Sequence, residues 1–218
     1  MRDAGARGEY VGVDIVEHPA WRRIEHNRDL RARFLVHDAH ALDSLDGGPF
    51  DLALAVTTFE HFADDALVMR GLARKLARGG HAIVIVPSEY SPALYWRHGY
   101  RTYRRGRIPE LARDAGLEVE ETFPIGGLAG FIFHAAWFNV SRAAVLSGKA
   151  ALAVAAGGRS RARRWLARPW KALDNTMFWH QRFALGRRAH VRANVAAARI
   201  DERLPILPAL YGYILRVP

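Results

Sequence analysis

The segment 50–87, FDLALAVTTFEHFADDALVMRGLARKLARGGHAIVIVP, decides the fold of this 218-residue chain. Its two short apolar runs, residues 51–56 and 82–86, have the composition of buried parallel strands. Between them, Asp64 and Asp65 are suited to begin a helix, and Gly79-Gly80 to end it. A strand, a crossover helix and a second strand form a βαβ unit, so the sequence predicts an α/β protein with a mostly parallel sheet.

Two further short strands precede this unit, and each is predicted to end in an acid. Residues 9–14 (EYVGVD) end at Asp14, and residues 33–38 (RFLVHD) end at Asp38. Ligands of such sheets bind beyond the carboxyl ends of the strands, where an acid can accept hydrogen bonds from ribose hydroxyls. Asp14 fits that role, Asp38 fits an acceptor for an adenine amino group, and Ile15 can pack on the adenine face. The alternative is that both aspartates are ordinary strand-end or capping residues.

The rest of the chain supplies the other elements. The sequence predicts helices at about 19–30 and 109–115, a helical segment over 126–199, and strands at 117–123 and 209–217.

In this order, the motifs resemble class I S-adenosylmethionine-dependent methyltransferases of type 11/12. The resemblance covers about residues 1–127 and the terminal strand. It is carried by the acid-ended strands, FDLALAVTTFEHF (50–62), ARGG (77–80), the Tyr- and Arg-rich segment 100–105 and Gly126-Gly127. It implies a doubly wound, Rossmann-like sheet, mostly parallel with an antiparallel last strand, and S-adenosylmethionine as cofactor.

The resemblance also implies roles for individual residues. It places Asp14 on the cofactor's ribose, Asp38 and Ala39 on its adenine, and the turn from Thr57 to His61 beside the methyl donor. His61 is either a general base, which its chemistry at neutral pH permits, or a residue that closes the turn by hydrogen bonding to backbone. No spacing of His, Asp and Glu predicts a metal site.

One motif of this family has no counterpart in the 218 residues. The family begins with a strand and a Gly-x-Gly-x-Gly turn that contacts the methionine part of the cofactor, and no such sequence occurs here. We therefore expect the first strand of the fold to be missing, through a start codon assigned downstream, a fragment or a decayed paralogue. Its absence should leave two unpaired inner edges, beside the strands that end at Asp14 and Val56. Cofactor binding by the chain as given should then be weak or absent.

A basic, aromatic segment separates the last two predicted strands. We divide the chain into a methyltransferase core (1–125), a helical insertion (126–205) and the last strand (206–218). Residues 141–200 hold 13 basic residues and one acid, and RSRARRWLARPWK (159–171) alternates arginine with tryptophan. The insertion is either a helical cap with solvated arginines, an element for an anionic membrane surface, or, less favoured, a nucleic-acid surface.

Composition limits the remaining possibilities. The chain has no cysteine, which excludes disulfides and thiol chemistry. Its N-terminus has no apolar signal core, so we expect a cytoplasmic protein, peripheral to the membrane if the insertion binds lipid. The predicted function is methyl transfer to a small or lipid-like acceptor. The alternative is a non-catalytic relic or binding module of the same fold, and the sequence specifies neither the acceptor nor the oligomeric state.

Overall fold

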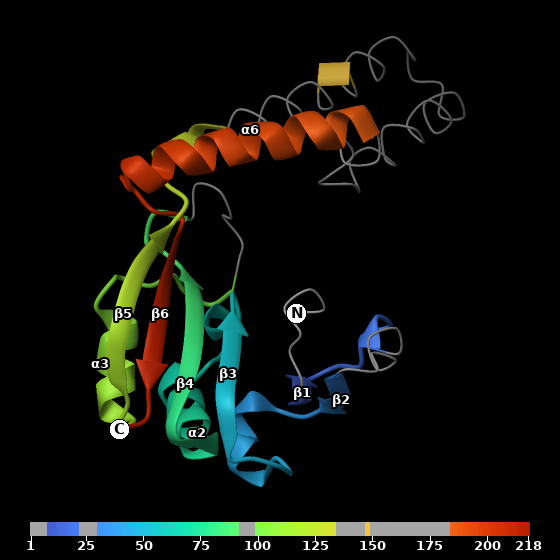
Figure 1. Cartoon of the computed structure of the whole chain (residues 1–218), viewed down its shortest axis with the longest axis vertical. Helices are drawn as coiled ribbons and strands as arrows, with labels where there is room; N and C mark the ends of the chain where they lie inside the picture. Colours follow the sequence, from blue (N-terminus) through green and yellow to red (C-terminus); the bar gives the residue numbers. More distant parts are fainter. Residues whose placement is uncertain (1–7, 22–29, 92–98, 134–146, 149–183) are drawn as a thin grey trace, which may run out of the picture. The chain divides into compact units, whose positions relative to one another are not determined.

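The structure is a computed structural model that describes residues 8–21, 30–91, 99–133, 147–148 and 184–218 (Figure 1). The chain divides into two compact units. Unit 1 consists of residues 1–86, 98–123 and 212–218, and unit 2 of residues 87–97 and 124–211.

The predicted strands form, and they belong to two sheets. Strands β1 (Gly8–Asp14) and β2 (Leu30–Val36) pair in parallel. A four-stranded sheet has the order β3-β4-β6-β5, and Figure 1 shows β6 between β4 and β5. Its members are β3 (Phe50–Val56), β4 (Leu76–Pro87), β5 (Glu118–Ile125) and β6 (Leu210–Arg216). The α/β architecture and the mostly parallel sheet are thus confirmed.

The last strand is antiparallel to its neighbour, as predicted. The Ser88 amide donates to Ala209 O at 3.0 Å, whereas Gly79 N donates to Val217 O at 3.0 Å. Because the residue number rises along β4 while it falls along β6, the two strands run in opposite directions.

Among the described residues, no strand pairs with the second edge of β3. The Thr57 amide donates to Ile85 O at 2.8 Å, next to the parallel ladder between β3 and β4. Backbone groups of alternate residues point to opposite edges of a strand, so those of Leu52, Leu54 and Val56 face away from β4. Within the part of the chain that the structure describes, β1 and β2 form one sheet and β3 belongs to another, and the missing strand stays a prediction.

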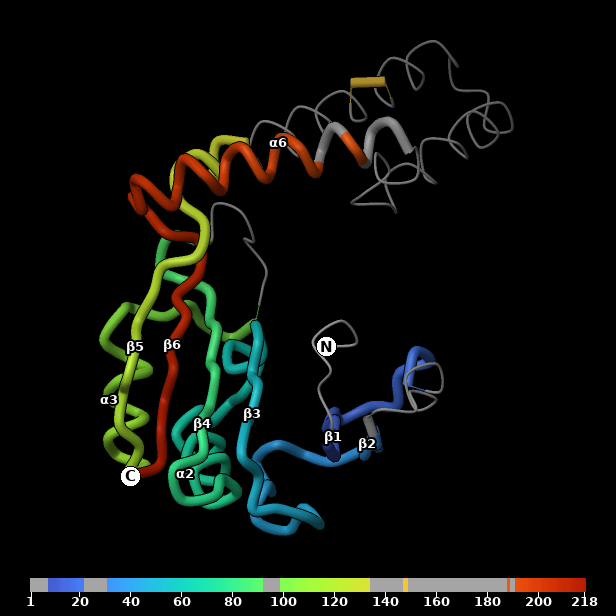
Figure 2. The backbone as a smooth tube through the Cα atoms, viewed as in Figure 1, coloured from blue at the N-terminus to red at the C-terminus, as the bar shows by residue number. Residues whose placement is uncertain are grey.

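Helix α2 (Asp65–Lys75) begins as predicted but ends earlier. Asp64 caps it by accepting a hydrogen bond from Leu67 N at 2.8 Å. The prediction that Gly79 and Gly80 end this helix is wrong, because β4 starts at Leu76 and runs through both glycines. The cause lies far along the chain, since Gly79 N and Gly80 O hydrogen bond to Val217. Figure 2 follows this path from β3 through α2 to β4.

Two other predicted boundaries are tested by the structure. Helix α3 (Arg107–Asp114) is followed by Gly116 at φ 78°, the left-handed conformation expected after a helix end. Strand β2 ends at Val36 rather than at Asp38. Asp38 instead caps the 3-10 helix η2 (Ala39–Ser44), so the prediction that it terminates the strand is wrong.

The core of unit 1 lies on one face of the four-stranded sheet. Ala82, Val84 and Val86 of β4 are fully buried, together with side chains of β6, α2 and α3 such as Tyr213, Leu215, Val68, Met69 and Ile108. The opposite face is open, with Leu52, Leu54 and Val56 exposed by 50%, 47% and 53%. Parallel sheets are normally covered on both faces, so this face lacks a layer within the described residues.

Unit 2 contains a helical turn at residues 128–133 and the long helix α6 (Ala184–Arg203). Asp201 joins them, accepting hydrogen bonds from Ala129 N and Gly130 N at 2.9 Å each. The helices predicted over 126–199 are confirmed in these two parts. Most of that prediction, including residues 159–171, and most of the helix predicted at 19–30 lie outside the described residues. None of the described helices is long and apolar enough to cross a membrane.

Candidate functional site

The carboxyl ends of β1 and β2 meet, as the predicted site requires. His37 N donates to the backbone oxygen of Asp14 at 2.8 Å, which ties the two strand ends together. The exposed Asp14 carboxylate accepts one bond, from Val16 N at 3.2 Å, and the neighbouring Ile15 side chain is largely exposed. A carboxylate has about four acceptor positions, so Asp14 retains capacity for the hydroxyls of a ligand.

Asp38 lies just beyond the end of β2 and serves as a cap. Its Oδ1 accepts from His40 N at 2.9 Å and contacts His40 Nδ1 at 2.8 Å. The backbone hydrogen bond from His40, followed by the side-chain bond, lowers the pKa of Asp38 below its usual value. The capping alternative is therefore realised for Asp38, while its role toward adenine, with Ala39, stays a prediction.

His40 connects this strand end to the turn after β3. Its Nε2 accepts from Asp64 N at 3.4 Å, which assigns the ring proton to Nδ1 beside Asp38. Its ring meets Phe62 edge-on, with centroids 5.7 Å apart. Sequence reasoning missed this link, because a histidine two residues after an acid carries no sign of a partner 24 residues away.

The turn after β3 holds a strained residue. Thr57 adopts φ 47°, a left-handed conformation that β-branched residues rarely take. Thr58 follows, and its hydroxyl donates to Val56 O at 3.1 Å. Strain of this kind costs about 1–3 kcal/mol and is concentrated at functional sites. The place of Thr57 beside the methyl donor stays a prediction.

His61 ends the 3-10 helix η3 (Phe59–His61) that follows. Its backbone amide donates to Thr58 O at 2.9 Å, and its half-exposed ring lies 4.0 Å from the Oε1 atom of the buried Glu60. The turn is thus closed by the backbone of His61. The role of its ring as a general base stays a prediction.

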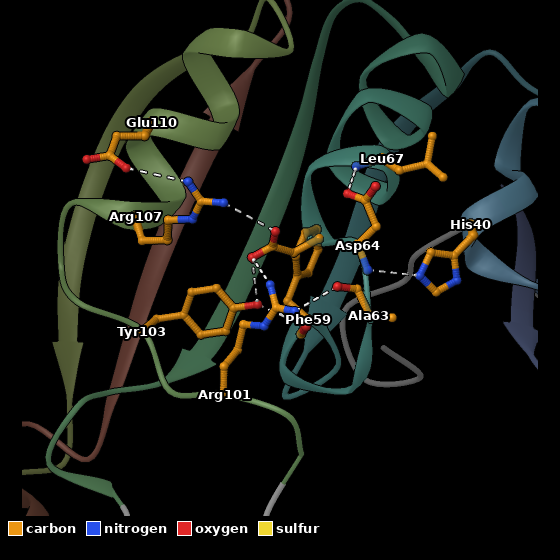
Figure 3. A network of polar contacts seen from close by, with 10 residues as sticks. His40, Phe59, Ala63, Asp64, Leu67, Arg101, Tyr103, Arg107 and Glu110 are labelled. Carbon is orange, nitrogen blue, oxygen red and sulfur yellow. Dashed lines mark hydrogen bonds and ion pairs between the residues drawn. The ribbon is translucent and has the colours of Figure 1, made fainter.

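A buried polar cluster contacts the turn that contains η3 (Figure 3). The Tyr103 hydroxyl donates to Phe59 O at 2.9 Å and lies 3.3 Å from Asp65 Oδ2. Burial, and then the charge of Asp65, raise the pKa of Tyr103 well above its usual value. Tyr103 is almost fully buried, so we assign it to holding η3 in place rather than to chemistry.

Two arginines complete the cluster. Arg101 Nη1 lies 2.9 Å from Asp65 Oδ2 and Arg107 Nη2 lies 3.4 Å from Asp65 Oδ1, while Arg101 Nη2 donates to Ala63 O at 2.7 Å. Asp65 therefore binds the segment 101–107, whereas Asp64 alone caps α2. The sequence shows the two parts of this arrangement, an aspartate pair and a later Tyr- and Arg-rich segment. It does not show that the two parts are in contact.

The residues at these strand ends fit the adenosine half of a nucleotide cofactor. Asp14 is an exposed acid, and Ile15 beside it is an exposed aliphatic residue. Asp38 is a second acid, just beyond the end of the neighbouring strand. The described residues contain no group of three or more His, Cys, Asp or Glu side chains that is suited to hold a metal ion.

The fold and these strand ends define a Rossmann-like nucleotide-binding class. Residues 1–84 match the family model described as a methyltransferase domain. This match confirms the resemblance to class I S-adenosylmethionine-dependent methyltransferases, and the cofactor it implies is S-adenosylmethionine.

Two solved structures with TM-scores of 0.50 or more agree on the fold. The [4+2]-cyclase SpnF superimposes with a TM-score of 0.52 at 16% identity, covering 95% of this chain and 65% of its own. A proposed methyltransferase from Bacillus halodurans gives a TM-score of 0.50 at 11% identity, covering 97% and 84%. A 1,6-didemethyltoxoflavin N1-methyltransferase from Burkholderia thailandensis shares 24% identity over 52% of each chain, with a TM-score of 0.44.

The chain spans 52% of the Burkholderia protein and 65% of SpnF, less than two thirds of either. No curated protein sequence matches the chain. Since SpnF is described as a cyclase, the fold by itself does not specify methyl transfer.

Proposed function

We propose that this chain is an S-adenosylmethionine-dependent methyltransferase that acts on a small or lipid-like acceptor. The observation that supports the proposal most directly is the methyltransferase-domain match over residues 1–84, which includes both parallel strands and the acids after them. When bound, S-adenosylmethionine supplies an electrophilic methyl group to a nucleophilic atom of the acceptor.

In this proposal the chain's own residues bind and orient. Asp14 accepts hydrogen bonds from the ribose hydroxyls, because its carboxylate is exposed and only partly used. Asp38 and Ala39 hold the adenine edge, and Ile15 covers the adenine face. His61 takes the proton that the acceptor loses, provided the acceptor is a hydroxyl or a protonated amine.

The 218 residues supply contacts to only part of the cofactor, because no Gly-x-Gly-x-Gly turn is present to hold its methionine portion. We expect calorimetry on the 218-residue chain to detect weak binding of S-adenosylmethionine or none. The longest in-frame form that the gene encodes should be measured beside it. A micromolar dissociation constant for the 218-residue chain would contradict this account of the missing contacts.

The role of Asp14 has a matched control in Asp51, an exposed acid near the opposite end of β3. In whichever form binds, Asp14→Ala should weaken the affinity by about 1.5–3 kcal/mol, the scale of hydrogen bonds to a charged group. Asp51→Ala should leave the affinity unchanged. Equal effects of the two substitutions would remove Asp14 from the cofactor site.

The alternative is a non-catalytic binding module, and its support is that β1 and β2, within the described residues, form a sheet separate from that of β3. Transfer of a labelled methyl group to lipid extracts and to small hydroxyl and amine acceptors separates the two functions. A methyltransferase labels one acceptor fraction, and His61→Ala lowers that rate by about 100-fold or more if His61 is the base. A cofactor-binding form that labels no fraction supports the binding module.

A further inference from the structure

We propose that the outer face of helix α6 binds an anionic lipid surface. The inference concerns residues of unit 2 and does not depend on methyl transfer. Helix α6 contains five arginines and two acids, Asp201 and Glu202, and it has no Phe, Tyr or Trp.

The exposed arginines of α6 form one row. Arg188, Arg192, Arg199 and Arg203 are all exposed, and they follow one another at intervals of four, seven and four residues. With 3.6 residues per turn, these intervals keep them within about 60° of one another around the helix axis. The row extends for about 22 Å, at 1.5 Å per residue.

Exposed aliphatic side chains lie on both sides of this arginine row. Val191 and Val195 are 54% and 45% exposed, and Ile200 is 53% exposed. The helical repeat places the two valines about 70° to one side of the row and Ile200 about 90° to the other. The stems of the arginines can lie along this apolar surface while their guanidinium groups reach phosphates.

The opposite side of α6 is the packed one. Ala197 and Asp201 are 7% and 4% exposed, and Asp201 holds the amides of Ala129 and Gly130. These two residues lie about 150–170° from the arginine row. Within the described residues, none of the four arginines forms an ion pair. The outer face thus combines four arginines, against the one exposed acid Glu202 beside the valines, with exposed aliphatic groups.

The positive charge of α6 and the aliphatic side chains beside it favour a membrane surface over nucleic acid as the binding partner. A basic amphipathic helix lies in the interface of a membrane, where arginines meet anionic headgroups and aliphatic groups enter the boundary layer. Nucleic acid would satisfy the arginines as well, but single-stranded binding uses aromatic side chains for stacking, and α6 has none. The exposed valines would contribute nothing to phosphate contacts.

Sedimentation with vesicles tests the proposal on the full chain. The probes are phosphatidylcholine vesicles alone and vesicles in which about one third of the lipid is phosphatidylserine. We expect binding to the anionic vesicles only, and weaker binding as salt is raised. Substituting Arg192, Arg199 and Arg203 together by Gln should lower the partition constant at low salt by roughly 100-fold or somewhat more, since each is worth about 1 kcal/mol and about 1.4 kcal/mol is tenfold.

Two further variants separate the face of α6 from the overall charge of +10. The first replaces Arg70, Arg78 and Arg113, three exposed arginines of unit 1, by Gln, and it should bind as the unchanged chain does. The second, Val191→Ser with Val195→Ser, should weaken binding at low and at high salt. Circular dichroism confirms that each variant keeps its helix content.

Three results would overturn the proposal. Equal binding to neutral and anionic vesicles removes the role of the arginines. Equal losses from the two arginine triples assign the binding to net charge rather than to α6. Tight binding of a single-stranded polynucleotide that the valine variant does not change, without vesicle binding, identifies a nucleic-acid surface instead.

Discussion

Arg101 and Asp65 form an ion pair in which the carboxylate is buried and the guanidinium is not. Arg101 Nη1 lies 2.9 Å from Asp65 Oδ2, and the two side chains are 34% and 4% exposed. A carboxylate that has lost its water depends on protein donors, here Arg101, Arg107 and Tyr103. The pair holds the segment 101–107 against the first turn of α2. That turn follows η3, the 3-10 helix that ends at His61.

Asp65→Ala should lower the free energy of unfolding by about 1.5–3 kcal/mol, since it removes the acceptor that Arg101 and Arg107 share. The partly exposed arginines regain water, which keeps the loss below that for a fully buried pair. Asp64→Ala, which removes only the cap of α2, should cost about 1 kcal/mol. Urea denaturation of both variants measures the difference.

The comparison of these neighbours is internally controlled, because both substitutions remove one negative charge from the same helix start. Asp114→Ala, at an exposed position at the end of α3, reports the effect of charge alone. If Asp65→Ala costs no more than Asp64→Ala, the cluster in Figure 3 contributes no stability.

Asp201→Ala should loosen the start of the helical turn at 128–133. The carboxylate accepts two backbone hydrogen bonds at 2.9 Å, and Ala supplies no acceptor. We expect faster hydrogen exchange at the amides of Ala129 and Gly130 and a loss of about 1.5–3 kcal/mol. Glu202→Ala, at the exposed neighbouring position, is the control and should change neither amide.

Gly127→Ala probes the same contact from the other side. A Cβ at position 127 would lie 2.7 Å from Asp201 Oδ1, closer than real Cβ atoms approach an oxygen. The variant should therefore reproduce the exchange pattern of Asp201→Ala. Normal protection of both amides in the Gly127→Ala protein would show that this contact is not formed in solution.

The sequence predicts those parts of the fold that depend on neighbouring residues. Apolar runs locate the strands, Asp64 locates the start of α2, and Gly116 locates the end of α3. The errors arise where distant residues decide. The end of α2 moves to Lys75 because Val217, directly after β6 and more than 100 residues away, hydrogen bonds to Gly79 and Gly80.

The same distinction holds for the candidate site. Asp14 could be proposed as a ligand-binding residue because a strand-end acid has a local signature. His40 and Asp65 could not be assigned, since their partners, Asp64 and Arg101, are brought to them only by the folded chain. The prediction that the first strand of the fold is missing has a different basis, because it rests on a motif that the family resemblance requires and the 218 residues do not contain.

Asp38 should titrate below the usual pKa of 3.8, because His40 donates to its carboxylate through the backbone and then through the ring. A depressed pKa means that the fold favours the charged form. This contribution to stability is therefore present above the ordinary pKa and is lost as pH falls through the folded one. NMR titration of the Asp38 carboxyl carbon measures the shift.

His40→Ala tests the cause of that shift. The backbone amide at position 40 remains, so the pKa of Asp38 should rise only part of the way toward its ordinary value. Thr58→Ala, a change in the nearby turn, should not move it. An Asp38 that titrates normally in the unchanged chain would show that the cap at η2 is not formed.

The open face of the four-stranded sheet leads to the last prediction. Leu54 is 47% exposed, whereas Val84, on the neighbouring strand, is fully buried on the opposite face. Leu54→Lys should therefore change the free energy of unfolding by about 1 kcal/mol or less. Val84→Lys should unfold unit 1, since it places a charge among apolar side chains without a partner.

Leu54→Lys should also reduce self-association. An apolar face beside an unpaired strand edge favours contacts between copies, and a lysine on that face opposes them. Sedimentation velocity at several protein concentrations measures the change, with the exposed Arg70→Gln variant as a control for altered charge. If Leu54→Lys is as damaging as Val84→Lys, this face is covered in solution, and the apolar side chains of β3 then belong to the core.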